Sequence, residues 1–352
     1  MKPHQALSAW YAKKSRKLPW RATRDPYAIW VSEVMLQQTQ VKTVIPYYEK
    51  FLRQFPTVES LAKSPIDEVL RHWSGLGYYR RAHLLHQGAL WILEKHRGKF
   101  PHSVVELKAV PGIGPYTAGA VLSIAFDIPT PIVDGNVIRV LSRYFGIKRS
   151  IQERSTMITI WEESERWVLS SQSPRIFNQA LMELGALICT KGQPSCEQCP
   201  IQAGCAAFLR QMTHAIPNIP KRPQKTKLIW VCPVIKKGED FLFLKSEGQR
   251  WWKGLWCFPH TELASLSQIS GQLKKTQRQF KTQDPVAIGK FKHTVTHHEL
   301  HVYPYLFEQA RLPATHKNSD EAQFFSNEDI ESLALSSLTR KILKYIPGPL
   351  VQ

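Results

Sequence analysis

Four of the six cysteines in this 352-residue chain lie within residues 189–205, which read CTKGQPSCEQCPIQAGC. They are Cys189, Cys196, Cys199 and Cys205, a spacing of Cys-x6-Cys-x2-Cys-x5-Cys. Four thiolates in one loop can bind either zinc or a 4Fe–4S cluster, because both take tetrahedral sulfur ligands. Structural zinc sites usually show two close cysteine pairs, and this loop has one. The residues alone leave zinc, an iron–sulfur cluster and four unrelated loop cysteines open.

Two carboxylic acids stand in contrasting surroundings. Glu33 lies in the nearly uncharged stretch IWVSEVMLQQTQV, where apolar neighbours are expected to raise its pKa and let it act as a general acid. Asp134 lies in PIVDGNVIRV, where backbone N–H groups are expected to keep it ionised. Two carboxylates in unlike environments are typical of enzymes that cleave glycosidic bonds. The plainer alternatives are a solvated helix face for Glu33 and a helix N-cap for Asp134.

A glycine-rich turn lies in the segment AVPGIGPYTAGAVLSIAF, residues 109–126. Pro115 is expected to begin a helix, and Gly112 and Gly114 would let a phosphate approach the N–H groups at its N-terminus. The pattern resembles the helix-hairpin-helix of DNA-binding proteins. An ordinary corner between two helices is the alternative.

The chain carries a formal net charge of +19, which favours a polyanionic partner. Nucleic acid and an anionic membrane surface are the two candidates. No apolar run approaches the roughly 18 residues of a membrane span, and the first residues lack the apolar core of a signal peptide. We therefore expect a cytoplasmic protein associated with nucleic acid and not with a membrane. In such a reducing compartment clustered cysteines favour metal binding over disulfides.

The elements that must position these residues fall into two groups, and the chain is expected to be an α+β multidomain protein. Residues 1–208 are predicted to be helical, with Asp25 capping a helix that begins at Pro26 and carries Glu33. Residues 209–227 form a basic, proline-containing linker. Residues 228–352 are predicted to form a mixed α/β domain.

Two strand pairs are predicted in the second domain. LIWVCPVIK, the turn KGED and FLFLK indicate a β-hairpin. FKHTVTHHELHVYPYLF, residues 291–307, indicates another pair of strands.

Several motifs of the first domain occur together and in order: SEVMLQQTQV, GLGYYRRAHLL, VPGIGPYTAGAV, VDGNVIRVLSR and the cysteine loop. Together they resemble the adenine DNA glycosylases of the MutY type, in the endonuclease III superfamily. The resemblance is dense over residues 4–208. It implies an all-α helix-hairpin-helix glycosylase domain and a 4Fe–4S cluster on the four cysteines.

The resemblance also implies an activity. Adenine mispaired with 8-oxoguanine or guanine in double-stranded DNA would be flipped out and hydrolysed from its sugar, leaving an abasic site. Glu33 would protonate the adenine at N7, and Asp134 would stabilise the oxocarbenium ion. Tyr116 and Asn136 would support that site. The residues expected to line the adenine pocket are Arg16, Leu18, Trp20, Arg21 and Gln179, and those expected to enter the base stack are Gln38 and Tyr78.

One position argues against strand cleavage. Sister enzymes that cut the strand carry a lysine just after the hairpin, which forms a Schiff base, whereas this chain has Tyr116 there. A phenol cannot form an imine, so a monofunctional glycosylase is expected. Tyr116 also occurs in thymine-mismatch relatives, and a thymine or uracil mismatch glycosylase is therefore the alternative enzyme. A zinc-stabilised DNA-binding protein without catalysis is the alternative outside enzymes.

The second domain resembles a Nudix fold at WWKGLWCFPH, residues 251–260. The glutamate-rich segment that binds Mg²⁺ in Nudix hydrolases is missing from ELASLSQISGQLKK, so binding without hydrolysis is expected. HTVTHHEL, residues 293–300, matches the loop that reads 8-oxoguanine, with Val295-Thr296-His297 in place of the usual Phe-Ser-His. Thr296 and His297 would contact the lesion. A metal site of His293, His297, His298 and His301 is the alternative. The whole chain is expected to act as a monomer.

Overall fold

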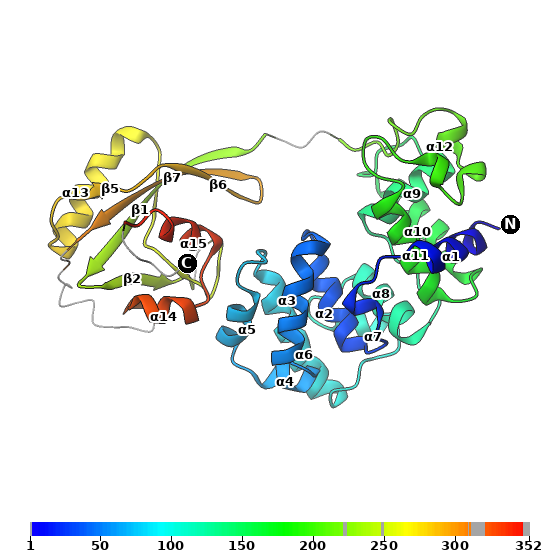
Figure 1. The fold of residues 1–352 in the computed structure, drawn as a ribbon, viewed down its shortest axis with the longest axis horizontal. Helices are drawn as coiled ribbons and strands as arrows, with labels where there is room; N and C mark the ends of the chain where they lie inside the picture. The colour runs from blue at the N-terminus through cyan, green and yellow to red at the C-terminus, as the bar shows by residue number, and fades with distance from the viewer. Residues whose placement is uncertain (1, 221–223, 248–249, 309, 311–320, 348–352) are drawn as a thin grey trace. The chain divides into compact units, whose positions relative to one another are not determined.

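The structure is a computed structural model that describes residues 2–220, 224–247, 250–308, 310 and 321–347. Its contacts divide the chain into two compact units, shown in Figure 1. The first unit comprises Met1–Lys63 and Leu84–Arg222, and the second comprises Ser64–His83 and Pro223–Gln352. The sequence analysis assigned residues 64–83 to the first domain, whereas the contacts group them with the second unit. The expected domain boundaries, 1–208, 209–227 and 228–352, stay a prediction. No helix of the described residues is long and apolar enough to cross a membrane.

The first unit is helical, as predicted. Its elements are α1 (Pro3–Lys14), η1 (Pro19–Arg21), α2 (Pro26–Leu36), α3 (Val41–Gln54), α4 (Val58–Lys63), most of α6 (Arg80–His96), α7 (Val104–Ala109), α8 (Pro115–Phe126), α9 (Gly135–Phe145), α10 (Arg154–Leu169), α11 (Pro174–Leu187), η2 (Cys196–Gln198), η3 (Gln202–Gly204) and α12 (Ala206–Leu209). The predicted cap is confirmed, because the Asp25 side chain accepts hydrogen bonds from the N–H groups of Tyr27 and Ala28.

Two apolar helices form the centre of this unit. Residues 27–35 of α2 and 117–124 of α8 are all buried, and the two helices pack against each other. A helix that is apolar on every side must be surrounded by protein. A polar side chain on such a helix is therefore held away from bulk water.

Helix α11 packs against α1, α8 and α9. A side chain at Gly185 would place its Cβ 2.6 Å from Asn136 Cβ, so only glycine allows α11 this close to the first turn of α9. This close approach brings residues of α11 beside Asp134, which caps α9.

The second unit contains a mixed sheet: β1 (Thr226–Lys237), β2 (Asp240–Lys245), β3 (Trp256–Cys257), β4 (Thr261–Leu263), β5 (Val286–Ala287), β6 (Phe291–Val295), β7 (His298–Phe307) and β8 (Ala322–Phe325). Its helical elements are α5 (Ile66–Trp73), η4 (Leu266–Gln268), α13 (Ile269–Phe280), α14 (Asn327–Ser332) and α15 (Ser337–Leu343). Both predicted strand pairs are confirmed, since β1 pairs with β2 and β6 with β7, each antiparallel. The long parallel pairing of β1 with β7 was not predicted.

Candidate active site

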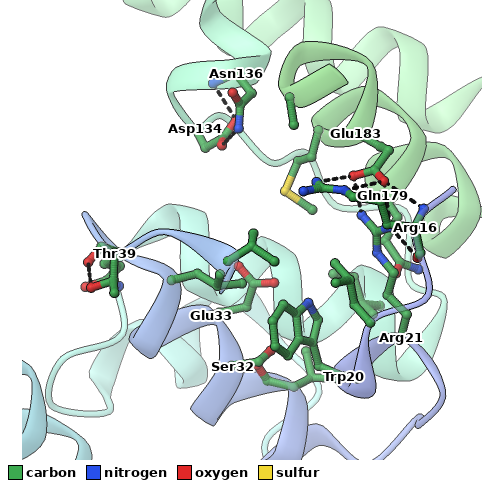
Figure 2. A pocket seen from close by; sticks show the side chains of 18 of the residues that line it. Arg16, Trp20, Arg21, Ser32, Glu33, Thr39, Asp134, Asn136, Gln179 and Glu183 are labelled. Carbon is green, nitrogen blue, oxygen red and sulfur yellow. Dashed lines mark hydrogen bonds and ion pairs between the residues drawn. The ribbon is translucent and has the colours of Figure 1, made fainter. Parts of the chain in front are cut away.

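A pocket of about 810 Å³ lies in the first unit, with walls from η1, α2, α8, α11, the start of α9 and the loop after α2. Figure 2 shows its side chains. The sequence-predicted residues that line it are Arg16, Leu18, Trp20, Arg21, Glu33, Gln38, Tyr116, Asp134, Asn136 and Gln179. Segments more than a hundred residues apart in the sequence therefore converge on one cavity.

Glu33 lies on buried helix α2 and is 4% exposed. Burial raises the pKa of its carboxyl group from 4.5 to about 7, although a hydrogen bond from the Tyr116 hydroxyl to Oε2 opposes the rise. Figure 2 shows the carboxyl group facing the pocket. A carboxylic acid that keeps its proton near neutral pH can donate it to a bound ligand. The solvated-face alternative for Glu33 is wrong, because the side chain is buried.

Asp134 is the N-cap of α9 and also lines the pocket. Its Oδ1 accepts hydrogen bonds from the N–H groups of Asn136 (2.9 Å) and Val137 (2.8 Å), and its Oδ2 accepts one from Asn136 Nδ2 (2.9 Å). Burial raises the pKa of Asp134, and these three donors limit the rise. The expectation from the sequence took account of the hydrogen-bond donors, which lower the pKa of Asp134, but not of its burial, which raises it. The cap and the site residue are the same side chain.

Glu183 on α11 is a second buried acid of this pocket, and the sequence analysis missed it. Arg16 donates to it from its backbone N–H (2.9 Å), Nε (2.9 Å) and Nη2 (2.6 Å). Arg21 donates from Nη1 (3.0 Å) and Nη2 (2.8 Å). Burial alone would raise the pKa of Glu183, but the hydrogen bonds from both arginines lower it to about 2. A lone acid in the apolar stretch ALMELGAL was the available signal, the same kind that drew attention to Glu33.

The remaining wall combines a fixed amide with apolar groups. Gln179 Oε1 accepts a hydrogen bond from the Tyr11 hydroxyl (3.2 Å), and its Nε2 donates to the Arg175 carbonyl (3.1 Å), so the amide has one defined orientation. Trp20 is 6% exposed and Leu18 is 9% exposed. A flat, polar-edged heterocycle suits a pocket of this composition.

The cysteine loop follows α11. Arg143 Nη1 lies 3.3 Å from Cys189 Sγ as a donor, and backbone N–H groups donate to the sulfurs of Cys199 and Cys205. Burial and the neighbouring cysteines raise the pKa of the Cys196 thiol. Donors aimed at sulfur stabilise thiolate ligands.

Within the described residues, no three His, Cys, Asp or Glu side chains are placed to hold a single metal ion. A 4Fe–4S cluster binds one thiolate at each iron, so its ligands stand farther apart than those of one zinc ion. The four free cysteines of this loop are the donor set that such a cluster takes.

A hydrogen-bonded chain connects this loop to the pocket. Arg139 Nε donates to the Cys189 carbonyl, and Arg139 Nη2 donates to Asn136 Oδ1 (2.9 Å). Asn136 in turn donates to Asp134 Oδ2. The position of the Asp134 carboxylate thus depends on the backbone of the cysteine loop.

Other predicted residues lie outside the pocket. Gly112 has a φ of +82° in the turn before α8, and a Cβ there would lie 2.8 Å from Leu84 Cβ, whereas nothing lies within 4 Å of a Cβ at Gly114, so the turn has open space at Gly114. Tyr78 and Thr296 belong to the second unit and have φ values of +50° and +52°. Thr296 and His297 form the two-residue turn between β6 and β7.

The four histidines of this region do not share one site among the described residues. His298 Nε2 accepts a hydrogen bond from Arg250, whereas His301 Nε2 lies 2.8 Å from Glu299 Oε1. Burial lowers the pKa of His293 to about 4. The metal alternative at these histidines therefore has no support from the geometry.

Comparison with known proteins defines the class to which this fold and pocket belong. Residues 31–166 match the profile of the HhH-GPD superfamily base excision DNA repair proteins, and residues 230–345 match the NUDIX domain. A solved thermostable thymine-DNA glycosylase is 29% identical and covers 59% of this chain and 95% of its own, with a TM-score of 0.53. The first unit is thus a helix-hairpin-helix glycosylase domain, and a Nudix-like domain with a mixed sheet follows.

Curated relatives narrow the class to one family. An adenine DNA glycosylase of Buchnera aphidicola subsp. Baizongia pistaciae is 39% identical over 307 residues, covering 86% of this chain and 84% of the relative. The enzyme of the same name from subsp. Acyrthosiphon pisum is 35% identical over 343 residues, covering 97% and 96%. The human adenine DNA glycosylase is 44% identical over 216 residues, covering 58% of this chain and 39% of its own. The chain belongs to the adenine DNA glycosylase family of base excision DNA repair enzymes.

Proposed function

We propose that this glycosylase excises adenine mispaired with 8-oxoguanine or guanine in double-stranded DNA and leaves an abasic site. The observation that carries the proposal is the pairing of Glu33 and Asp134 in one pocket, with a pKa of about 7 at Glu33. The flipped adenine would enter between the apolar wall and the polar side chains of Arg16 and Gln179. Extrusion costs a few kcal/mol and is easiest at a mismatch.

The chemistry then follows from the two acids. Glu33 donates its proton to N7 of the adenine, so the C1′–N9 bond can break with its electron pair leaving on a neutral base. The carboxylate of Asp134 stabilises the positive charge that develops at C1′. Water adds at C1′ and completes the hydrolysis. Asn136 holds Asp134, and Tyr116 holds Glu33 through its hydroxyl.

The same pocket disfavours strand cleavage. No lysine is among its lining residues in the described chain, and Tyr116 is engaged with Glu33. An amine is required for a Schiff base with the sugar. We therefore propose a monofunctional enzyme. We also propose that it acts as a monomer.

The proposed division of labour follows the expected boundaries. Residues 1–208 would carry the chemistry and a 4Fe–4S cluster held by Cys189, Cys196, Cys199 and Cys205. Gly112 and Gly114 would bind a DNA phosphate, and residues 209–227 would link to the lesion reader at 228–352. Thr296 and His297 would contact 8-oxoguanine, and Gln38 and Tyr78 would fill the gap that the adenine leaves. The cluster would order the loop that supports Asp134 through Arg139.

Base release from four duplexes tests the proposal. Adenine should be released from the A:8-oxoguanine and A:G duplexes. Thymine should not be released from T:G, nor uracil from U:G. Thr296→Ala should reduce the preference for 8-oxoguanine over guanine by about 1–3 kcal/mol, the value of one good base contact. Release of thymine or uracil would establish the alternative enzyme, and no release at all would leave only DNA binding.

Iron and sulfide analysis tests the cofactor separately. The purified protein should contain iron and absorb visible light, and Cys199→Ser should lose most of the iron, because a hydroxyl is a poor ligand for it. Stoichiometric zinc without iron would contradict the cluster.

A further inference from the structure

A buried guanidinium lies behind the Gly75–Tyr79 loop of the second unit. Arg81 is 8% exposed, and burial lowers its pKa to about 10. Its Nη2 donates to the carbonyls of Gly77 (3.0 Å) and Leu76 (3.4 Å), and its Nε donates to the Tyr78 carbonyl (3.4 Å). Three consecutive carbonyls of the loop therefore face one cation.

Two aromatic rings contact the same group. The Arg81 Cζ atom lies 5.3 Å from the ring centroid of Trp73 and 5.5 Å from that of Tyr78. Trp73 is fully buried, and its indole Nε1 donates to the Gly77 carbonyl (3.1 Å). Tyr78 is 45% exposed. The guanidinium thus connects a buried anchor with an exposed ring.

The loop has a backbone that needs such support. Gly75, Gly77 and Tyr78 have φ values of +108°, +73° and +50°. The left-handed region is unfavourable for a residue with a Cβ, so Tyr78 persists there only if its surroundings hold it. Arg81 stabilises this conformation by hydrogen bonds to the carbonyls of Gly77 and Tyr78 and by its contact with the Tyr78 ring.

We propose that Arg81 is a positioning residue that presets the Gly75–Tyr79 loop, so that Tyr78 enters the base stack without rearrangement. The inference rests on the proposed function, in which Tyr78 fills the gap left by adenine. Binding costs less when a loop already has its bound conformation. Lysine could keep the charge at this position but could not reproduce the planar fork that serves three carbonyls.

Arg81→Lys tests the role, and Arg80→Lys at the exposed neighbouring position is the matched control. The probe is a duplex in which 2-aminopurine replaces the target adenine opposite 8-oxoguanine, because its fluorescence rises when the base leaves the stack. Arg81→Lys should lower this rise at saturating enzyme and slow single-turnover adenine release about tenfold, the loss of a desolvated cation–π contact and one hydrogen bond. The control variant should match the wild type in both measurements.

A defect in the chemistry alone would slow release and leave the fluorescence rise intact, so that pattern would overturn the proposal, as would wild-type values in both measurements. Circular dichroism melting checks the fold. If Arg81→Lys does not fold, Trp73→Phe removes the indole donor to Gly77 and leaves a smaller ring beside Arg81, so it should reduce both signals at least about threefold, the loss of one hydrogen bond. Wild-type values in this variant would then overturn the proposal.

If the wild type itself neither extrudes 2-aminopurine nor releases adenine, the proposed function fails and the role of Tyr78 fails with it.

Discussion

Two glutamates on opposite walls of one pocket have opposite acidities. Glu33 and Glu183 are 4% and 1% exposed, so burial alone does not distinguish them. The pKa of Glu33 rises to about 7, whereas the pKa of Glu183 falls to about 2. The partners make the difference. Glu33 meets a phenol on an apolar helix, and Glu183 meets the guanidinium groups of Arg16 and Arg21.

The contrast assigns different tasks to two identical side chains. A buried acid without a cation keeps its proton and can give it away, so Glu33 suits general acid catalysis. A buried acid that two arginines clamp stays ionised and cannot donate a proton, so Glu183 suits the fixing of pocket geometry. The chemistry of a carboxyl group is therefore set by what its surroundings supply.

The largest expected effect is on catalysis at Glu33. Glu33→Gln keeps an acceptor for the Tyr116 hydroxyl but removes the acidic proton, and adenine release should fall by on the order of 10²–10⁴. Single-turnover release and DNA binding should be measured together, and binding should persist. Release at the wild-type rate would remove Glu33 from the mechanism.

At Glu183 the main expected effect is on stability. Glu183→Gln leaves two guanidinium groups with a neutral partner, and breaking a buried ion pair in this way costs about 3–5 kcal/mol. Urea unfolding should show a lower midpoint at pH 7. Glu162→Gln makes the same chemical change at an exposed position and is the matched control, which should leave the midpoint unchanged. If Glu183→Gln unfolds at the wild-type midpoint, the clamp does not stabilise the fold.

The two acids should also give stability profiles of opposite sign against pH. The folded pKa of Glu33, about 7, lies above the ordinary 4.5, so its contribution is fully present below pH 4.5 and is lost as pH rises through 7. Glu33→Gln should therefore become more stable than the wild type between pH 5 and 8, by up to about 3 kcal/mol. The folded pKa of Glu183, about 2, lies below 4.5, so its contribution is present above pH 4.5 and is lost as pH falls toward 2.

Unfolding of the wild type and both variants at pH 5 and pH 8 checks these signs. The stability difference should grow with pH for Glu33→Gln and stay nearly constant for Glu183→Gln. A constant difference for Glu33→Gln would show that Glu33 is ionised in the folded protein across this range.

The comparison also shows how far sequence reasoning reached. The signal that singled out Glu33, an acid within an apolar helix, is present at Glu183 as well. The sequence could not supply the partners, because Arg16 and Arg21 lie more than 160 residues away and meet Glu183 only when α1, η1 and α11 are packed. Local capping and hairpin signals do not have this weakness, and the cap at Asp25 and the two strand pairs were predicted correctly.

Non-local pairing limited the remainder of the fold prediction. Strands β1 and β7 run parallel in register from Thr226↔His298 to Ile235↔Phe307, and no local pattern encodes a partner so distant. Residues 64–83 group with the second unit for the same reason, because their contacts are with residues far away in the sequence, which no local pattern predicts. The positive φ of Thr296 was also not foreseen, because a β-branched residue is rare in that conformation.

The smallest expected effect concerns how the two arginines share the clamp. The Arg16 side chain is 35% exposed and the Arg21 side chain is 14% exposed, so solvent screens the contact at Arg16 more. The Arg16 backbone N–H also donates to Glu183 Oε1, and a lysine at this position keeps that donor. Arg16→Lys keeps the charge and loses the planar fork, so stability should fall by about 0.5–1 kcal/mol.

Arg21→Lys removes two side-chain bonds from a better shielded site, and a larger loss is expected there. Arg24→Lys at an exposed neighbouring position is the matched control and should leave the unfolding midpoint unchanged. Because Glu183 stays ionised in both clamp variants, adenine release at saturating substrate should change little while the substrate concentration for half-maximal rate rises. A fall in the maximal rate as large as that of Glu33→Gln would place the clamp in the proton-transfer step and remove the distinction between the two glutamates.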